Sequence, residues 1–180
     1  MSTTKTKPWI EVGYQLVAAS GFTSLSVELV SRKVGKNKSS FYHHFGELNV
    51  FISELLSHHL ERAKLLATEL EGCESIRPGM IHVFLQYKVD FLFHKQLRIE
   101  RGNTDYERCF EEVHALFESA IEETWAEYLQ MEQQKQLAKT FLRLVSENFL
   151  LQITEENYTF DWLNSYLSEV SGMLNQLKPK

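Results

Sequence analysis

One short segment, residues 35–45, restricts the fold of this chain more than any other part of it. It reads Gly-Lys-Asn-Lys-Ser-Ser-Phe-Tyr-His-His-Phe, so a glycine that tolerates a tight turn precedes a polar stretch and then aromatic residues. The side chain of Asn37 is placed to cap a helix near residues 38–44. A helix this short and polar cannot form a core, so we interpret it as the second helix of a helix-turn-helix, which places one helix in the DNA major groove.

The residues before this segment predict two further helices. Pro8 suits the first turn of a helix, because the N–H that proline lacks has no helical partner there, and Gly21 is placed to end that helix. Gly13, in its interior, permits close approach by a neighbour. Ser26 is expected to cap a second helix near residues 27–33. Three short helices with a tight turn between the last two form a helix-turn-helix head.

Composition and charge agree with this interpretation. The 180 residues include only 8 glycines and 3 prolines, and 43% are hydrophobic, which favours an all-α fold with a buried core. The net charge of −5 is unevenly distributed, because residues 1–48 contain six basic and three acidic residues, a net charge of +3 against −8 for the remainder. A basic head on an acidic body is typical of a local phosphate-binding surface.

Residues 9–60 resemble the DNA-binding domain of the TetR family of bacterial transcriptional regulators. The resemblance rests on elements that follow one another without a gap: Gly21-Phe22, the loop Thr23–Ser26, the helix Val27–Val34, Gly35, and Tyr42-His43-His44-Phe45. Two positions differ from the family pattern, because Lys36 replaces an apolar residue and Leu48 replaces a lysine. The resemblance implies a helix-turn-helix DNA-binding domain at residues 1–47 and a helical effector-binding and dimerisation domain at residues 48–180.

Two groups of residues are candidate DNA contacts. The exposed positions of the turn and the third helix are expected to reach base edges, because lysine, asparagine and serine match the hydrogen-bonding groups of the major groove: Lys36, Asn37, Lys38, Ser39, Ser40 and His43. Ser26 and Tyr42 match family positions that resemble contacts to the phosphate backbone. The alternative is an ordinary solvated helix. Phe41 and Phe45 are expected in the core instead.

The remainder of the chain predicts a helical body. Its helices are expected near residues 47–70, 77–95, 104–130 and 132–153, and after Thr159. Segment 77–95 is apolar on nearly every side, so it is expected at the centre of the body. The resemblance implies an effector pocket, for which the candidate ligand-binding residues are Tyr87, Phe91, His94, Phe110, His114, Phe117 and Trp125. Such a pocket suits an apolar or aromatic effector, whereas the alternative at each position is plain aromatic core.

The last two helices have broad apolar faces that a small body has little interior to cover. We expect them to pack against the same helices of a second copy as a four-helix bundle. The candidate residues of this dimer interface are Phe141, Val145, Phe149, Trp162, Leu163, Tyr166, Leu167, Val170 and Leu174. The alternative is that these side chains close the core of the monomer.

Motifs for catalysis are weak. Glu111 and His114 have the spacing of half a di-iron site, but no second motif of this kind occurs, and the sequence contains no phosphate-binding loop and no HExxH motif. His58 and His59 are interpreted as part of a solvated helix face. The two cysteines are far apart and predict no disulfide framework.

Taken together, these features predict a sequence-specific DNA-binding transcriptional regulator that is not an enzyme and needs no cofactor or metal. Its expected partners are a double-stranded DNA operator, a second copy of the chain and a small effector that releases it, as a repressor, from DNA. No signal segment precedes the first helix and no run approaches the about 18 apolar residues of a membrane span, so we expect a cytoplasmic protein. The alternative is a helical protein-binding or scaffold protein of the same fold with weak or no DNA binding.

Overall fold

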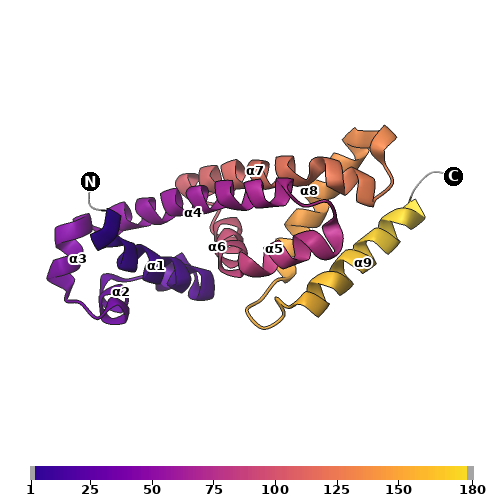
Figure 1. Cartoon of the computed structure of the whole chain (residues 1–180). Helices are drawn as coiled ribbons and strands as arrows, with labels where there is room; N and C mark the ends of the chain where they lie inside the picture. Colours follow the sequence, from indigo (N-terminus) through magenta and orange to yellow (C-terminus); the bar gives the residue numbers. More distant parts are fainter. Residues whose placement is uncertain (1–2, 178–180) are drawn as a thin grey trace. The chain divides into compact units, whose positions relative to one another are not determined.

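The computed structural model describes residues 3–177, and every regular element among them is a helix (Figure 1). Side chains at positions 3, 4, 174, 175 and 177 lie outside this description. The predicted all-α class is confirmed over the described chain. The chain forms two compact units. The first unit contains the residues up to Arg62 together with Val89–Glu112, and the second unit contains Ala63–Lys88 together with the residues from Val113 onward.

The first unit contains the predicted helix-turn-helix and the helices that pack with it. Its elements are α1 (Thr3–Ser20), the 3-10 turn η1 (Phe22–Ser24), α2 (Val27–Val34), α3 (Lys38–Phe45), the first turns of α4 (Leu48–Glu71), α6 (Lys88–Ile99) and the first turns of α7 (Thr104–Tyr128). The bounds of α2 and α3 agree with the prediction to within one residue. Only α1 differs appreciably, because it begins at Thr3, ahead of Pro8.

Local hydrogen bonds hold the turn between α2 and α3 in place. Ser26 Oγ accepts a hydrogen bond from the Leu29 N–H at 3.2 Å, and Asn37 Oδ1 accepts one from the Ser40 N–H at 2.8 Å. Both predicted caps are therefore present. Gly35 ends α2 in the left-handed region, at φ 73° and ψ 31°, where a side chain would be strained. The start and end of each helix thus follow from residues next to it.

An aromatic core holds the three short helices together. Trp9 of α1 meets Phe41 of α3 edge to face at 5.7 Å between ring centroids. Phe51 of α4 contacts both Phe41, at 5.2 Å, and Phe45, at 4.8 Å. The absence of a side chain at Gly13 makes this packing possible, because an added Cβ would lie 2.4 Å from Phe51 Cζ. The close approach expected at Gly13 is confirmed.

The second unit is built from the rest of α4 and α7 and from the later helices. Its further elements are the π-helical turn η2 (Ile76–Met80), α5 (Ile81–Gln86), the 3-10 turn η3 (Glu132–Gln134), α8 (Lys135–Gln152) and α9 (Phe160–Leu177). Helices α5 and α9 pack against each other (Figure 1). Tyr158, just before α9, donates a hydrogen bond from its hydroxyl to the Phe84 carbonyl at 3.1 Å. Within residues 3–177, every helix is too short or too polar to span a membrane.

The single helix expected at residues 77–95 is wrong, because the chain breaks there into α5 and α6. Tyr87 leaves the helical conformation, at φ −101° and ψ 23°. Its hydroxyl donates a hydrogen bond to Glu69 Oε1 at 2.7 Å, and the next residue, Lys88, donates from Nζ to the Glu155 carbonyl at 2.6 Å. These contacts with distant residues stabilise the break between the two helices. Residues 81–95 contain no glycine or proline that would have predicted it.

Candidate DNA-binding surface and effector cavity

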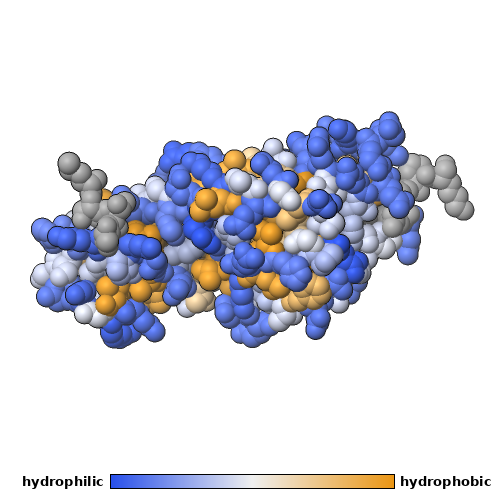
Figure 2. Space-filling model, viewed as in Figure 1, coloured by the Kyte–Doolittle hydropathy of each residue, from blue (hydrophilic) through white to orange (hydrophobic). Residues whose placement is uncertain are grey.

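Helix α3 presents a polar face to solvent and an aromatic face to the core. Tyr42 is 51% exposed, whereas Phe41 is fully buried and Phe45 is 5% exposed. The exposed residues follow helical spacing along one face: Lys38, Ser39, Tyr42 and His43. In Figure 2 the surface over α3 ranges from blue to white, without an orange patch. Among the other predicted DNA contacts, Lys36 and Asn37 are exposed, and Ser26 and Ser40 are half-buried.

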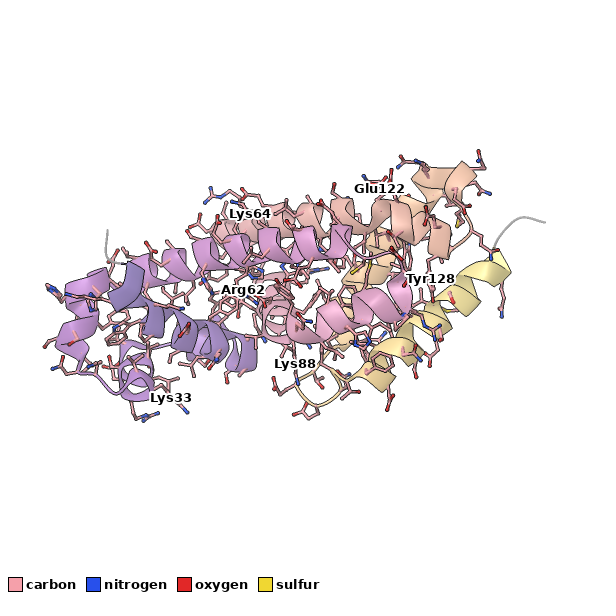
Figure 3. The ribbon with its side chains drawn as sticks, viewed as in Figure 1. Lys33, Arg62, Lys64, Lys88, Glu122 and Tyr128 are labelled. Atoms are coloured by element: carbon pink, nitrogen blue, oxygen red, sulfur yellow. The ribbon has the colours of Figure 1, made fainter. Side chains whose placement is uncertain are left out.

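One of the predicted base contacts already has a partner on the neighbouring helix. Lys38 Nζ donates a hydrogen bond to Glu28 Oε1 of α2 at 2.7 Å, and both side chains are more than half exposed. This hydrogen bond raises the pKa of Lys38 and lowers the pKa of Glu28. Two further cations, Arg32 and Lys33, are exposed at the end of α2, where Figure 3 labels Lys33. The Glu28 contact was not expected, because helix-turn-helix patterns specify which residues are exposed and not which ones pair.

A buried polar cluster joins α1, α4 and α6 within the first unit. Asp90 of α6 is 4% exposed and forms a two-pronged ion pair with Arg62 of α4, at 2.9 Å from Nε and 2.8 Å from Nη2. Figure 3 labels Arg62. Tyr14 of α1 donates its hydroxyl hydrogen to the same carboxylate at 2.9 Å. His59 lies 2.6 Å from the Tyr14 oxygen through Nδ1, and 3.3 Å from His94 Nδ1 through Nε2. The polar groups of three helices therefore meet at one carboxylate.

The hydrogen bonds of this cluster form a chain of donors that runs from His94 through His59 and Tyr14 to the Asp90 carboxylate. Because Tyr14 gives its single hydrogen to Asp90, its oxygen accepts from His59 Nδ1, and His59 Nε2 then accepts from His94 Nδ1. Burial lowers the pKa of His59 to about 3, so the ring is neutral at pH 7. Burial also raises the pKa of Tyr14 well above its ordinary value, with the Asp90 charge adding to the effect. The solvated helix face expected for His59 is wrong, because that residue is only 2% exposed.

The second unit contains an apolar cavity. The residues that line it come from η2, α5, α7, α8 and α9: Ile76, Phe84, Phe117, Ile121, Trp125, Leu142, Val145, Ser146, Phe149, Leu163, Tyr166 and Leu167. The cavity has a volume of about 40 Å³, which corresponds to a ligand of roughly one aromatic ring. Two lining residues carry hydroxyl groups, and Tyr166 donates its own to the Val145 carbonyl at 2.9 Å.

The structure brings together some of the predicted ligand-binding residues and separates others. Phe117 and Trp125 line the cavity, and His114 contacts the lining residue Ser146. Tyr87 belongs to the second unit but bonds to Glu69. The three others are buried in the first unit: Phe91, His94 and Phe110, of which the last two stack at 4.5 Å. Phe84, Phe149 and Tyr166, which complete the aromatic lining, were not among the candidates, because a single helical stripe does not reveal which helices face one another.

Two polar side chains of α7, His114 and Glu118, lie next to the cavity. Ser146 Oγ, in the lining, lies 3.1 Å from His114 Nε2, and the same nitrogen lies 3.4 Å from Glu118 Oε1. The side chains of His114 and Glu118 are 6% and 14% exposed. Glu118 Oε1 is buried and has no hydrogen-bond donor within the described structure. This is an unusual position for a carboxylate oxygen, because burying one without a donor is costly.

Most residues predicted to form a dimer interface lie inside the second unit of a single chain. Phe149, Leu163, Tyr166, Leu167 and Val170 are buried, Phe141, Val145 and Trp162 are half-buried, and the Leu174 side chain lies outside the description. A different stripe of α8 is exposed. Leu144 and Leu151 are 63% and 61% exposed, and Leu137, one heptad earlier, is 38% exposed. Their spacing of seven residues places them on one face of the helix.

The described residues contain no group of three or more His, Cys, Asp or Glu side chains that could hold a metal ion. Glu111 is exposed and His114 is buried, so the two do not form the inward-facing pair of a di-iron site. Cys73 and Cys109 are free thiols, and burial raises the pKa of Cys109 to about 12. A thiol with this pKa is unreactive at neutral pH.

No protein-family model and no curated protein matches this chain. It is similar to the crystal structure of a protein from Rhodococcus sp. assigned to the TetR family of transcriptional regulators, with a TM-score of 0.58 and 17% sequence identity. The similarity covers 95% of this chain and 96% of that chain, so it extends well beyond the residues 9–60 that carry the sequence resemblance. The chain has the fold of a TetR-family transcriptional regulator.

Proposed function

We propose that this protein is a sequence-specific DNA-binding regulator of transcription that reads its operator with α3. The observation that carries the proposal is the exposed face of Lys38, Ser39, Tyr42 and His43, on a helix whose opposite face is locked into an aromatic core. A rigid helix with polar side chains directed outward can enter the major groove without rearrangement. Lysine and serine side chains match base edges there, and the exposure of Tyr42 supports a contact with the phosphate backbone.

The regulator acts as a homodimer. Two recognition helices must lie about 34–36 Å apart to enter successive major grooves, which a single head cannot achieve. The stripe Leu137, Leu144 and Leu151 supports a two-fold interface along α8, because exposed leucines at heptad spacing pack well against the same stripe of a second copy. This interface differs from the residues expected from the sequence, most of which serve the core of one chain.

The cavity in the second unit holds the effector, and the protein is a repressor that the effector releases from DNA. Binding changes DNA affinity only if the effector favours one of two arrangements of the heads, by a difference in affinity between them. The enclosed apolar lining around Trp125 supports a small apolar or aromatic effector.

Fluorescence anisotropy of a labelled duplex tests the DNA-binding proposal. The duplex carries the DNA that flanks the gene of this protein, and a shuffled duplex of equal composition is the control, each titrated at two salt concentrations. We expect tighter binding to the flanking DNA, weakening steeply with salt, because phosphate contacts release counterions. Lys38→Ala should weaken binding at least tenfold, whereas Lys95→Ala, a matched loss of charge on α6, should not. Equal binding to both duplexes, or none at low salt, would favour the helical scaffold protein.

A further inference from the structure

The cavity and the half-buried side chain of Glu118 share one face of α7. Positions 114, 118, 121 and 125 follow the spacing of a single helical stripe. Ile121 and Trp125 line the cavity, and His114 and Glu118 continue the same stripe one turn further. Ser146 of α8 belongs to the lining and contacts His114. The polar group therefore adjoins the apolar space.

Hydrogen-bond directions show why Glu118 has no donor. Ser146 gives its hydroxyl hydrogen to the Arg143 carbonyl at 3.1 Å, so its oxygen accepts from His114 Nε2. That ring nitrogen carries one hydrogen, which Ser146 uses. Glu118 Oε1 lies 3.4 Å from the same nitrogen, longer than an ordinary hydrogen bond, and has no hydrogen-bond donor.

A nearby glutamate on the same helix shows the contrast. Glu122, labelled in Figure 3, lies one turn after Glu118, and its Oε2 accepts a hydrogen bond from Lys139 Nζ of α8 at 2.8 Å. The chain therefore supplies a hydrogen-bond donor to the more exposed Glu122 and none to the buried Glu118 Oε1. A donor that arrives with a ligand would satisfy that oxygen.

The cavity lining is suited to a cation with an aromatic body. Five of the lining residues are aromatic: Phe84, Phe117, Trp125, Phe149 and Tyr166. Aromatic ring faces attract cations, and flat apolar surfaces pack well against another ring. None of the described lining residues is basic, so nothing in the lining itself favours an anion.

We propose that the second-unit cavity binds a small aromatic amine, about one ring in size, whose ammonium group donates a hydrogen bond to Glu118 beside Ser146. This inference rests on the proposed effector cavity and adds the chemical class of its ligand. The aromatic ring occupies the space between Trp125 and its aromatic neighbours. The ammonium group supplies the hydrogen bond that Glu118 Oε1 does not receive from the chain.

Isothermal titration calorimetry with two probes of matched shape tests this assignment. Benzylamine is charged at neutral pH and benzyl alcohol is its neutral counterpart. The proteins are the full chain, Glu118→Gln and the control Glu123→Gln, which removes the same charge from an exposed position of α7. We expect the full chain and Glu123→Gln to bind benzylamine at least tenfold more tightly than benzyl alcohol. Glu118→Gln should lose this preference while its affinity for benzyl alcohol changes less than twofold.

Three outcomes would overturn the assignment. The first is equal affinity of the full chain for the two probes. The second is unchanged benzylamine affinity in Glu118→Gln, and the third is the absence of any benzylamine binding at millimolar concentration. The comparison of the two probes on the full chain needs no variant, so it decides the matter even if Glu118→Gln fails to fold.

The DNA titration separates this inference from the proposed function. Calorimetry detects benzylamine binding without DNA, and the anisotropy titration detects DNA binding without benzylamine. Benzylamine binding by a protein that ignores DNA would support the ligand class and contradict the regulator. DNA binding by a protein that ignores benzylamine would do the reverse.

Discussion

Two carboxylates, one in each unit, have opposite surroundings. Asp90 in the first unit receives hydrogen bonds from the Arg62 guanidinium and the Tyr14 hydroxyl, so its charge is fully used within the chain. Glu118 in the second unit has an oxygen without a donor, next to a cavity. A buried charge with its partners fixes one arrangement of helices, whereas one without them is a place where a ligand can add stability. The carboxylate of the first unit is thus satisfied by its own chain, whereas the ligand that we propose would satisfy the carboxylate of the second unit.

The largest expected effect comes from removing the charge of each carboxylate in turn. Asp90→Asn breaks the buried ion pair with Arg62, at a cost of about 3 kcal/mol in the free energy of unfolding. Glu118→Gln should change it by less than about 1 kcal/mol, because it removes a charge that lacks a donor. Urea denaturation followed by circular dichroism measures both. Equal losses would show that the two carboxylates play the same structural role.

The pH dependence of stability sharpens the contrast through His59. Its pKa is about 3 in the folded protein, below the ordinary value of about 6.5, so between these values the unfolded chain holds a proton that the folded one lacks. Stability is therefore complete above about pH 6.5 and falls as the pH decreases towards 3, by up to about 1.4 kcal/mol per pH unit. The charged and titratable groups that face this ring include His58, Arg62, His94 and Asp90. All four are retained in the variant used below.

Urea denaturation of the full chain and of His59→Gln between pH 7 and pH 4 tests this dependence. The introduced glutamine side chain does not titrate, so the stability of the variant should fall less steeply with decreasing pH. The difference between the two curves isolates the His59 proton from the other groups that titrate in this range. Parallel curves would mean that His59 binds a proton as readily in the folded protein as in the unfolded chain.

A smaller effect is expected from adding one methyl group to each unit. Gly13→Ala places a Cβ 2.4 Å from Phe51 Cζ in the first unit, and the resulting strain of about 1–3 kcal/mol outweighs the gain of about 1 kcal/mol in helix propensity. Gly172→Ala in α9 meets no atom within 4 Å, so it should raise stability slightly. Thermal denaturation of both variants measures the difference. A stabilised Gly13→Ala would contradict the close packing of the head.

The smallest change in stability is expected at an exposed carboxylate. Glu28→Gln removes the partner of Lys38 at the surface, where an ion pair contributes little, so unfolding should be nearly unchanged. Its effect on DNA binding is larger, because Lys38 becomes free for the DNA and a negative charge leaves the surface. We expect a several-fold increase in affinity by anisotropy. The control Glu11→Gln removes the same charge from α1, and an equal increase there would assign the effect to net charge alone.

The helix-turn-helix could be predicted from the sequence because its determinants are local. Ser26 and Asn37 cap the helices that follow them within three residues, and Gly35 permits the left-handed turn at its own position. The opposite faces of α3 follow from the spacing of Phe41 and Phe45 alone. For the same reason Gly13 could be identified as a point of close approach, although its neighbour Phe51 could not.

The body was harder to predict because its features depend on neighbours distant in the sequence. Tyr87 breaks a helix through contacts with Glu69 on α4 and, at the next residue, with Glu155 after α8. Aromatic residues on one stripe were divided between the cavity, as with Phe117, and the interior of the first unit, as with Phe110.

The sequence by itself determined the helical class, the bounds of α2 and α3, and the polar face of α3, because capping, turn geometry and helical periodicity act over a few residues. Only the tertiary structure decided which aromatic residues surround the cavity, which leucines of α8 remain exposed, and which buried carboxylate has a partner. Burial and pairing depend on which helices meet, and that is settled by packing between segments far apart in the chain.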